Sequence, residues 1–404
     1  MSRLYIIGIM LFWGIVLNGQ TVFQREKRDY IWLLGYDSNP EILTFGGTRI
    51  DFNVTPPTVT YEYRDVNFEA AATSICDAQG NLLFYSNGIY VANYLHEPME
   101  NGLGLNPDPL TDEWADNGFP LPQVILALTL DSDQYLLVHN LVSELEEEDQ
   151  YGSSYHSKML YCTKIDMAAN NGEGIVMEKN VPIIIDTIDI SGKLTAVRHA
   201  NGRDWWVVVA DYFSNGFYRL FVTPDTILNH GLQAIGDTVP SGLGQAAFSP
   251  DGTKYARLNI YRLGQDQFVD IYDFDRCTGT FSNPVQFTYR DTALMGGLAF
   301  SENSRFLYVS SFRFTYQFDL EAENIPDSKV IVGFPNPLGE GYFLSQLAPD
   351  GKIYIGTQGT DFHTHIIHSP NRRAPACNFE YIGLPLPTRN FRTGYRQPNA
   401  GSGF

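Results

Sequence analysis

A short phrase recurs along this chain: a strand ends in a tight turn of the form Ser/Thr-x-Asp/Asn-Gly or a close relative, and a strand of apolar and aromatic residues follows. The clearest copies run over 248–255, 300–308 and 347–354, and looser copies over 75–84, 130–135 and 199–205. In such a turn, Asp or Asn bonds its own backbone, a preceding Pro sets φ, and Gly takes the positive φ that closes a hairpin. We therefore expect structural turn roles for Asp77, Gly80, Asp251, Gly252, Asn303, Asp350 and Gly351.

The spacing of the phrase predicts the fold. Successive turns lie 54, 70, 50, 52 and 47 residues apart, at Asp77, Asp131, Asn201, Asp251, Asn303 and Asp350. A period of about 50 residues, with four short strands per unit, is typical of propeller blades. One further unit, around 30–35 and 48–52, precedes the first copy. The sequence thus predicts an all-β protein, a single β-propeller of seven four-stranded blades. We expect one terminus to close the ring by giving a strand to the other's blade, with 31–34 and 379–382 as candidates.

Composition and segment lengths agree with one all-β domain over 20–404. The chain has 24 Tyr, 26 Phe and 5 Trp, which suit pleated sheet, and 36 Gly and 22 Pro, which suit turns. Two insertions lengthen the repeat. Residues 101–119 are polar and rich in Pro and Asp, which predicts a long surface loop. The acidic run 144–149 is interpreted as a solvated face, with a cation-binding lip on the rim as the alternative.

The first nineteen residues have the pattern of a secretory signal peptide. Arg3 precedes the uncharged apolar run 4–17, which is too short to span a bilayer but suits the core of a signal sequence. A cut after Gly19 would leave a small residue at the cleavage position, and a retained membrane anchor is the alternative. No later stretch is long and apolar enough to span a membrane. We therefore expect an exported protein, either extracellular, on the cell surface or in the periplasm.

The net charge and the cysteines limit which partners, metals and cross-links we expect. With 46 acidic and 27 basic residues the formal net charge is −19, and no basic run exists, so nucleic acid is an improbable partner. The four cysteines lie far apart and form no CxxC pair, which argues against a zinc site. Their pairing stays open, because three disulfide arrangements and buried free thiols are all compatible with Cys76, Cys162, Cys277 and Cys377.

No constellation in the sequence predicts catalysis strongly. His363 and His365 share one face of a predicted strand and could take zinc or copper, but no third ligand can be located, so a neutral hydrogen-bonded pair is favoured. In Asp-Ile-Tyr-Asp-Phe-Asp over 270–275, only Asp273 and Asp275 share a face. Trp114 is the best candidate for a ligand-facing ring, whereas both rings of 205–206 suit packing between blades. No catalytic residue is assigned and no cofactor is required; calcium and zinc are the metals considered.

The motifs together resemble a known family. They lie at 77–88, 96–102, 165–180, 193–202, 273–279, 300–308, 317–320, 347–354 and 370–379. They look like the WD-repeat-like propeller region of secreted, cell-surface Bacteroidetes-type proteins, which are often exported by type IX secretion. The resemblance implies an extracellular or cell-surface propeller, frequently followed by a sorting domain, for which we expect no room before residue 404. The family offers no established catalytic residues to carry over.

Three functions remain on these grounds. The first is a non-enzymatic scaffold that binds a protein or a glycan at the cell surface or in the periplasm. The second is a hydrolase of lactonase type, with a metal-assisted site in the central funnel. The third is a structural component of a surface or gliding apparatus.

Overall fold

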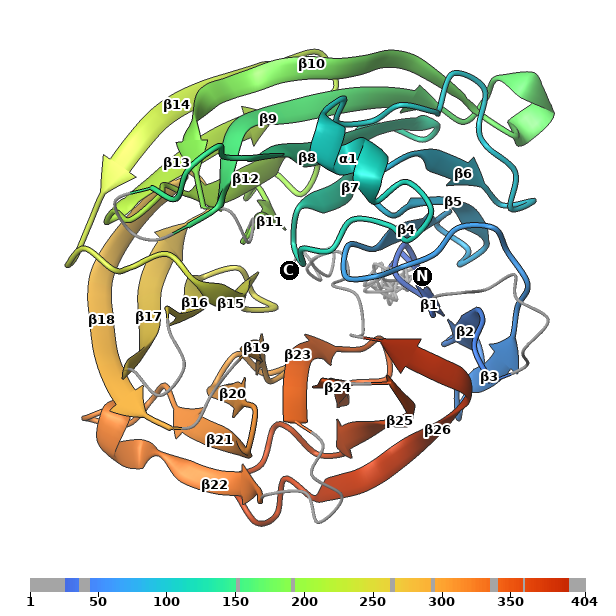
Figure 1. Ribbon diagram of the computed structural model, residues 1–404. Helices are drawn as coiled ribbons and strands as arrows, with labels where there is room; N and C mark the ends of the chain where they lie inside the picture. Colours follow the sequence, from blue (N-terminus) through green and yellow to red (C-terminus); the bar gives the residue numbers. More distant parts are fainter. Residues whose placement is uncertain are drawn as a thin grey trace, which may run out of the picture.

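The computed structural model describes residues 26–35, 44–149, 153–189, 193–261, 266–291, 295–334, 341–358 and 360–391. The predicted signal peptide, 1–19, lies outside these residues. Seven antiparallel sheets follow one another around a ring (Figure 1), which confirms the all-β, seven-bladed propeller. Helical structure is limited in the described residues to α1 (Pro109–Glu113) and the single turns η1 (Asn170–Gly172) and η2 (Pro326–Ser328). None of the helices in these ranges has the length and apolar character needed to cross a membrane.

Each sheet is built from consecutive strands. Blades 1 and 2 contain β1 (Ile31–Leu34), β2 (Thr48–Asp51), β3 (Thr58–Tyr61), then β4 (Thr73–Cys76), β5 (Leu82–Ser86), β6 (Val91–Asn93). Blades 3 and 4 contain β7 (Ile125–Thr129), β8 (Gln134–Glu144), β9 (Tyr155–Asp166), β10 (Ile175–Ile188), then β11 (Thr195–Arg198), β12 (Trp205–Ala210), β13 (Gly216–Val222), β14 (Ile227–Ala234).

The remaining three blades have four strands each. They contain β15 (Leu243–Phe248), β16 (Lys254–Ile260), β17 (Asp266–Asp275), β18 (Thr280–Arg290); β19 (Gly296–Phe300), β20 (Phe306–Ser311), β21 (Phe314–Asp319), β22 (Val330–Gly333); and β23 (Gly341–Leu347), β24 (Ile353–Gln358), β25 (Thr360–Ile367), β26 (Phe379–Phe391). In blade 2, residues 97–102 run back along β6, with Met99 N donating to Val91 O at 3.0 Å. They stand where the other blades have a fourth strand.

The recurring phrase forms the hairpin between the first and second strands of blades 2 to 7. Asp77 Oδ1 accepts from the backbone N–H groups of Gln79 and Asn81, both at 2.9 Å. Asp251 Oδ1 accepts from Thr253 N at 3.0 Å, and Asp350 Oδ1 from Lys352 N at 3.2 Å. The glycines of these turns have positive φ: +94° at Gly80, +71° at Gly252 and +77° at Gly351. In blade 6, Asn303 bonds the turn and Ser304 takes the positive φ, at +59°.

The ring closes differently from the prediction. Within the described residues β1 pairs with β2 and β26 pairs with β25, so neither gives a strand to the other terminal blade. Instead, the far end of β26 contacts blade 1. Arg389 N donates to Thr44 O at 2.8 Å, and the hydroxyls of Thr48 and Thr388 lie 2.9 Å apart. Strand β26 reaches this contact because it continues to Phe391, nine residues beyond the predicted 382.

The insertion at 101–119 is not simply a surface loop, which corrects the prediction. It contains α1, and Leu105, Leu110 and Phe119 are buried within it. Asp108 caps the helix by accepting from Leu110 N at 3.0 Å, and its other carboxylate oxygen accepts from Ser143 Oγ at 2.7 Å. The apolar residues spaced among the polar ones therefore fold inward against blades 2 and 3.

The core lies between neighbouring blades. Trp205 and Trp206 show how, because successive residues of β12 point to opposite faces. Trp205 packs toward blade 3 and donates to Thr129 O at 2.8 Å, whereas Trp206 packs toward blade 5 and donates to Arg276 O at 2.9 Å. Both rings are buried, as expected, so they stabilise the contacts between blades.

Candidate functional site

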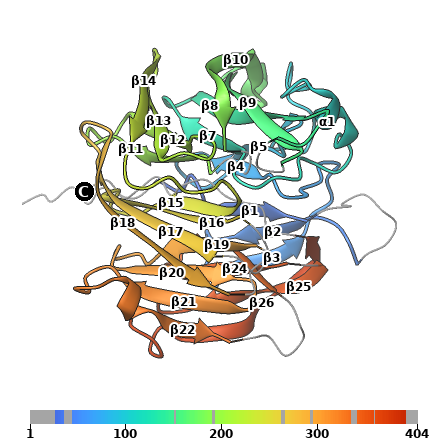
Figure 2. The ribbon, with the colours of Figure 1, turned by 60° about the vertical axis from the view of Figure 1, so that its left-hand side comes forward.

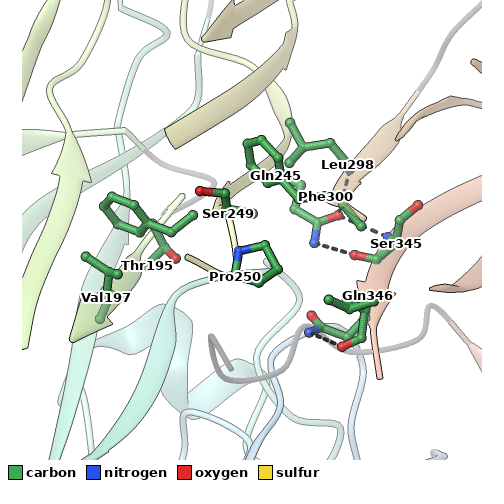
Figure 3. Close-up of a pocket in the computed structure, with 14 residues that line it drawn as sticks. Thr195, Val197, Gln245, Ser249, Pro250, Leu298, Phe300, Ser345 and Gln346 are labelled. Carbon is green, nitrogen blue, oxygen red and sulfur yellow. Dashed lines mark hydrogen bonds between the residues drawn. The ribbon is translucent and has the colours of Figure 1, made fainter. Parts of the chain in front are cut away.

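The central pocket lies among the inner strands of four adjacent blades (Figure 3). Its fourteen lining residues come from β11, β15, β19 and β23 and from the turn after β15, and none of them carries an ionisable side chain. The space open to the centre of a water molecule is about 40 Å³, room for a few waters. Figure 1 shows the same strands facing the middle of the ring.

Gln245 dominates the chemistry of this pocket. Its amide Nε2 donates to Ser345 O at 2.8 Å, and its Oε1 accepts from Leu298 N and Ser345 N, each at 3.0 Å. The side chain is buried, so these bonds are made away from water. One amide thus joins the inner strands of three blades, β15, β19 and β23. These polar atoms are committed to holding the ring together.

A second side-chain amide, that of Gln123, also joins neighbouring blades. Gln123, just before β7, donates from Nε2 to Ala246 O at 2.8 Å and accepts from Ala246 N at 2.7 Å. The backbone carbonyl of Gln123 accepts from Leu194 N at 3.2 Å. Gln123 therefore links blades 3, 4 and 5. Neither glutamine was a candidate from the sequence, because its partners lie 53 to 123 residues away and no local motif marks it.

Two buried ion pairs lie between blades 4 and 5. Lys193 Nζ contacts both carboxylate oxygens of Asp189 at 3.1 Å and donates to Gly242 O at 2.5 Å. Burial lowers the pKa of Lys193, against the opposing effect of Asp189. Arg257 Nε donates to Asp270 Oδ2 at 2.5 Å, and its guanidinium lies 4.7 Å from the ring centre of Phe217 in the neighbouring blade. Asp270 is therefore a packing partner of Arg257.

The other two aspartates of β17 also serve the fold. Asp273 accepts from Lys254 Nζ at 2.8 Å, and Asp275 accepts from Cys277 N at 2.8 Å in the turn to β18. In the acidic run, Asp149 accepts from Tyr212 OH at 2.7 Å. Trp114 is half-buried against the cluster between blades 2 and 3. None of these residues lines the central pocket.

His363 and His365 lie together, as their spacing predicts. Their ring centres are 5.4 Å apart on β25. His365 is fully buried among aromatic rings, with Tyr342 4.9 Å away, and its Nδ1 accepts from Ile382 N at 3.3 Å. Burial, assisted by His363, lowers the pKa of His365 to about 3, which keeps its ring neutral. Throughout the described ranges no group of three or more His, Cys, Asp and Glu side chains is arranged to hold a metal ion.

All four cysteines are free thiols in the structure. Three are buried and Cys277 is exposed. Burial raises the pKa of Cys162 to about 11 and also raises the pKa of Cys377, which disfavours the reactive thiolate at both. The thiols therefore supply no disulfide framework.

Comparison with known proteins supports the fold. No protein-family model and no curated protein matches the chain. A solved structure from Bacteroides uniformis, described as a putative 6-phosphogluconolactonase, is similar with a TM-score of 0.52 at 14 % identity, over 89 % of this chain and 97 % of that one. The solved structure of a protein from Lactobacillus plantarum is 13 % identical, with a TM-score of 0.49, and the match spans 92 % of this chain and 98 % of that one. At 14 % identity, the likeness to the Bacteroides uniformis structure shows the fold alone.

Proposed function

We propose that the protein is an exported propeller that acts as a non-enzymatic scaffold and binds a protein partner through its outer surface. The observation that carries this proposal is the hydrogen bonding of Gln245. Its side-chain amide in the central pocket makes three hydrogen bonds to neighbouring blades, so it does not face a ligand. In a propeller of this kind the centre holds the ring rigid, and the loops and outer strands are the surfaces left to bind.

Export and cell-surface placement rest on the sequence. The apolar run 4–17 and the family resemblance support a route out of the cytoplasm. A protein partner is favoured over a glycan because the best-defined exposed feature, described below, is a strand edge. Main-chain groups at such an edge recognise an extended polypeptide.

The test is binding of the labelled chain from Gln20 onward to intact cells of a Bacteroidetes species. We expect saturable binding that unlabelled chain displaces, that protease treatment of the cells removes, and that periodate oxidation of surface glycans leaves intact. Absence of saturable binding would contradict the proposal, as would hydrolysis of sugar lactones by the purified chain. Loss of binding after periodate alone would replace the protein partner by a glycan.

A further inference from the structure

The outermost strand of each blade is an edge with unpaired backbone groups, and natural proteins protect such edges with charges, prolines or very short strands. Most outer strands of this ring carry these devices. The charged residues and prolines of these strands are Glu178, Lys179, Pro182 and Asp186 on β10, Pro284 and Arg290 on β18, and Glu380, Pro385, Pro387 and Arg389 on β26. In blade 2, residues 97–102 include Glu97, Pro98 and Glu100. Strands β3 and β22 have only four residues each.

Strand β14 lacks both charge and proline over its whole length. It has eight residues, and the surrounding segment 226–236 contains no Asp, Glu, Lys, Arg or Pro, in a chain with 46 acidic residues. Its neighbour in the sheet is β13 alone within the described residues, and both ribbon views place it on the outer perimeter (Figures 1 and 2). A bulge at Gly231, with φ of +75°, divides the edge into two arms, 227–229 and 232–234.

Each arm presents a leucine to solvent. Leu228 is 48 % exposed and Leu232 is 45 % exposed. Leu228 pairs with Phe221 and Leu232 with Tyr218, and these two partners lie on opposite faces of β13. A strand added beside β14 would therefore find one apolar neighbour on each face of the sheet, together with main-chain groups of the edge other than His230 O, which accepts from Arg219 Nη2 at 3.3 Å.

The charges that surround β14 indicate what kind of strand fits. The exposed Asp225 and Asp237 stand just beyond its two ends, and Asp186 of β10 accepts a hydrogen bond from Tyr218 beside it. A second copy of this chain, paired antiparallel through β14, would bring Asp225 close to Asp237 of that copy, and like charges repel. An extended segment with basic residues at both ends would meet opposite charges instead.

We propose that the edge of β14 is a docking site for an extended segment of a partner protein, uncharged over about eight residues and basic at both ends, which adds as a fifth strand to blade 4. This inference deepens the proposed function and rests on it, since it assigns the scaffold's binding surface. Main-chain hydrogen bonds supply the attachment, the two leucines cover its apolar side chains, and the flanking aspartates select its charge.

The test uses a fluorescein-labelled peptide of eight alternating Thr and Val residues, with two lysines at each end, and the chain from Gln20 onward. We expect the anisotropy titration to give a Kd at least tenfold weaker for the Leu228→Lys/Leu232→Lys variant. The matched control is Ile331→Lys on β22, a residue that is 40 % exposed on another outer edge and should leave the Kd unchanged. The Asp225→Lys/Asp237→Lys variant should instead prefer the same peptide with glutamates at its ends.

An equal Kd for the Leu228→Lys/Leu232→Lys variant and the Ile331→Lys control would overturn the docking site. An unchanged peptide preference in the Asp225→Lys/Asp237→Lys variant would overturn it too. So would sedimentation of the wild-type chain as a dimer that Leu228→Lys/Leu232→Lys dissociates, because the edge would then hold a second copy. The cell-binding experiment separates this inference from the proposed function. If the Leu228→Lys/Leu232→Lys variant still binds cells like the wild type, the scaffold stands and the β14 site fails.

Discussion

At the scale of single residues, buried amides and imidazoles hold this ring together. Gln245 satisfies two N–H groups and one carbonyl on two neighbouring blades. His139 is equally committed: its Nδ1 contacts Asn106 Oδ1 at 2.7 Å and its Nε2 contacts Thr163 Oγ1 at 2.9 Å. These side chains bridge segments far apart in sequence, so local patterns gave no sign of them.

The first prediction concerns Gln245. The substitution Gln245→Leu leaves Leu298 N, Ser345 N and Ser345 O buried without that partner, and each lost bond costs about 1–3 kcal/mol. We expect a loss of about 3–5 kcal/mol in the free energy of unfolding, measured by urea denaturation. Gln346→Leu is the matched control, because Gln346 lines the same pocket and its side chain, among the described residues, bonds only the carbonyl of Leu347. A cost below about 0.5 kcal/mol is expected there; equal effects would contradict the role of Gln245.

The second prediction concerns acid. Burial lowers the pKa of His139 and of His365 from 6.5 to about 3, so both stay neutral in the folded chain and take up protons on unfolding. Their contribution is fully present above pH 6.5 and is lost as pH falls toward 3, at about 1.4 kcal/mol per pH unit for each histidine. Unfolding free energies between pH 7 and 5 should show this slope. His139→Gln should reduce this slope; an unchanged slope in that variant would show that the His139 ring is not held neutral.

At the scale of the element, the hairpin turns could be predicted from the sequence because each copy of the phrase closes its turn with the same local interactions. Asp or Asn bonds the backbone, and a glycine or Ser304 takes the positive φ. Local chemistry thus predicts the hairpins and, through their spacing, the blades. It did not predict α1 inside 101–119, because the apolar Leu105, Leu110 and Phe119 are too sparse to give a helical stripe. The docking edge had a visible signal, the absence of charge over 226–236, but sequence could not show that β14 is an outer strand.

Two glycines at the same turn position separate backbone strain from packing. A Cβ on Gly252 would lie 2.7 Å from Val197 Cγ2 of blade 4, whereas a Cβ on Gly351 would meet its nearest atom at 3.4 Å. Both have positive φ, so alanine should cost about 1 kcal/mol at either position. We expect Gly252→Ala to cost about 1–3 kcal/mol more than Gly351→Ala by urea denaturation, from overpacking between blades 4 and 5. Equal costs would mean that this contact relaxes freely.

At the scale of the whole molecule, the period of the phrase predicted the number of blades correctly, but not how the ring closes. Periodicity reports the repeated unit, whereas closure depends on the contact of β26 with blade 1, which occurs once. The same limit applies to function. The histidine pair was visible as a pattern, and only the structure shows that His365 lies inside an aromatic cluster and away from the central pocket.

In this propeller the middle of the ring holds the blades together, and the outer edge is the surface proposed to bind the partner. Hydrogen exchange of the chain from Gln20 onward, with and without the lysine-flanked peptide, distinguishes binding at the outer edge from binding at the centre. We predict that added protection is confined to 226–237, while the inner strands β15, β19 and β23 exchange slowly in both states because Gln245 joins them. Protection that instead appears on the strands lining the central pocket would contradict the account and place the binding site in the channel.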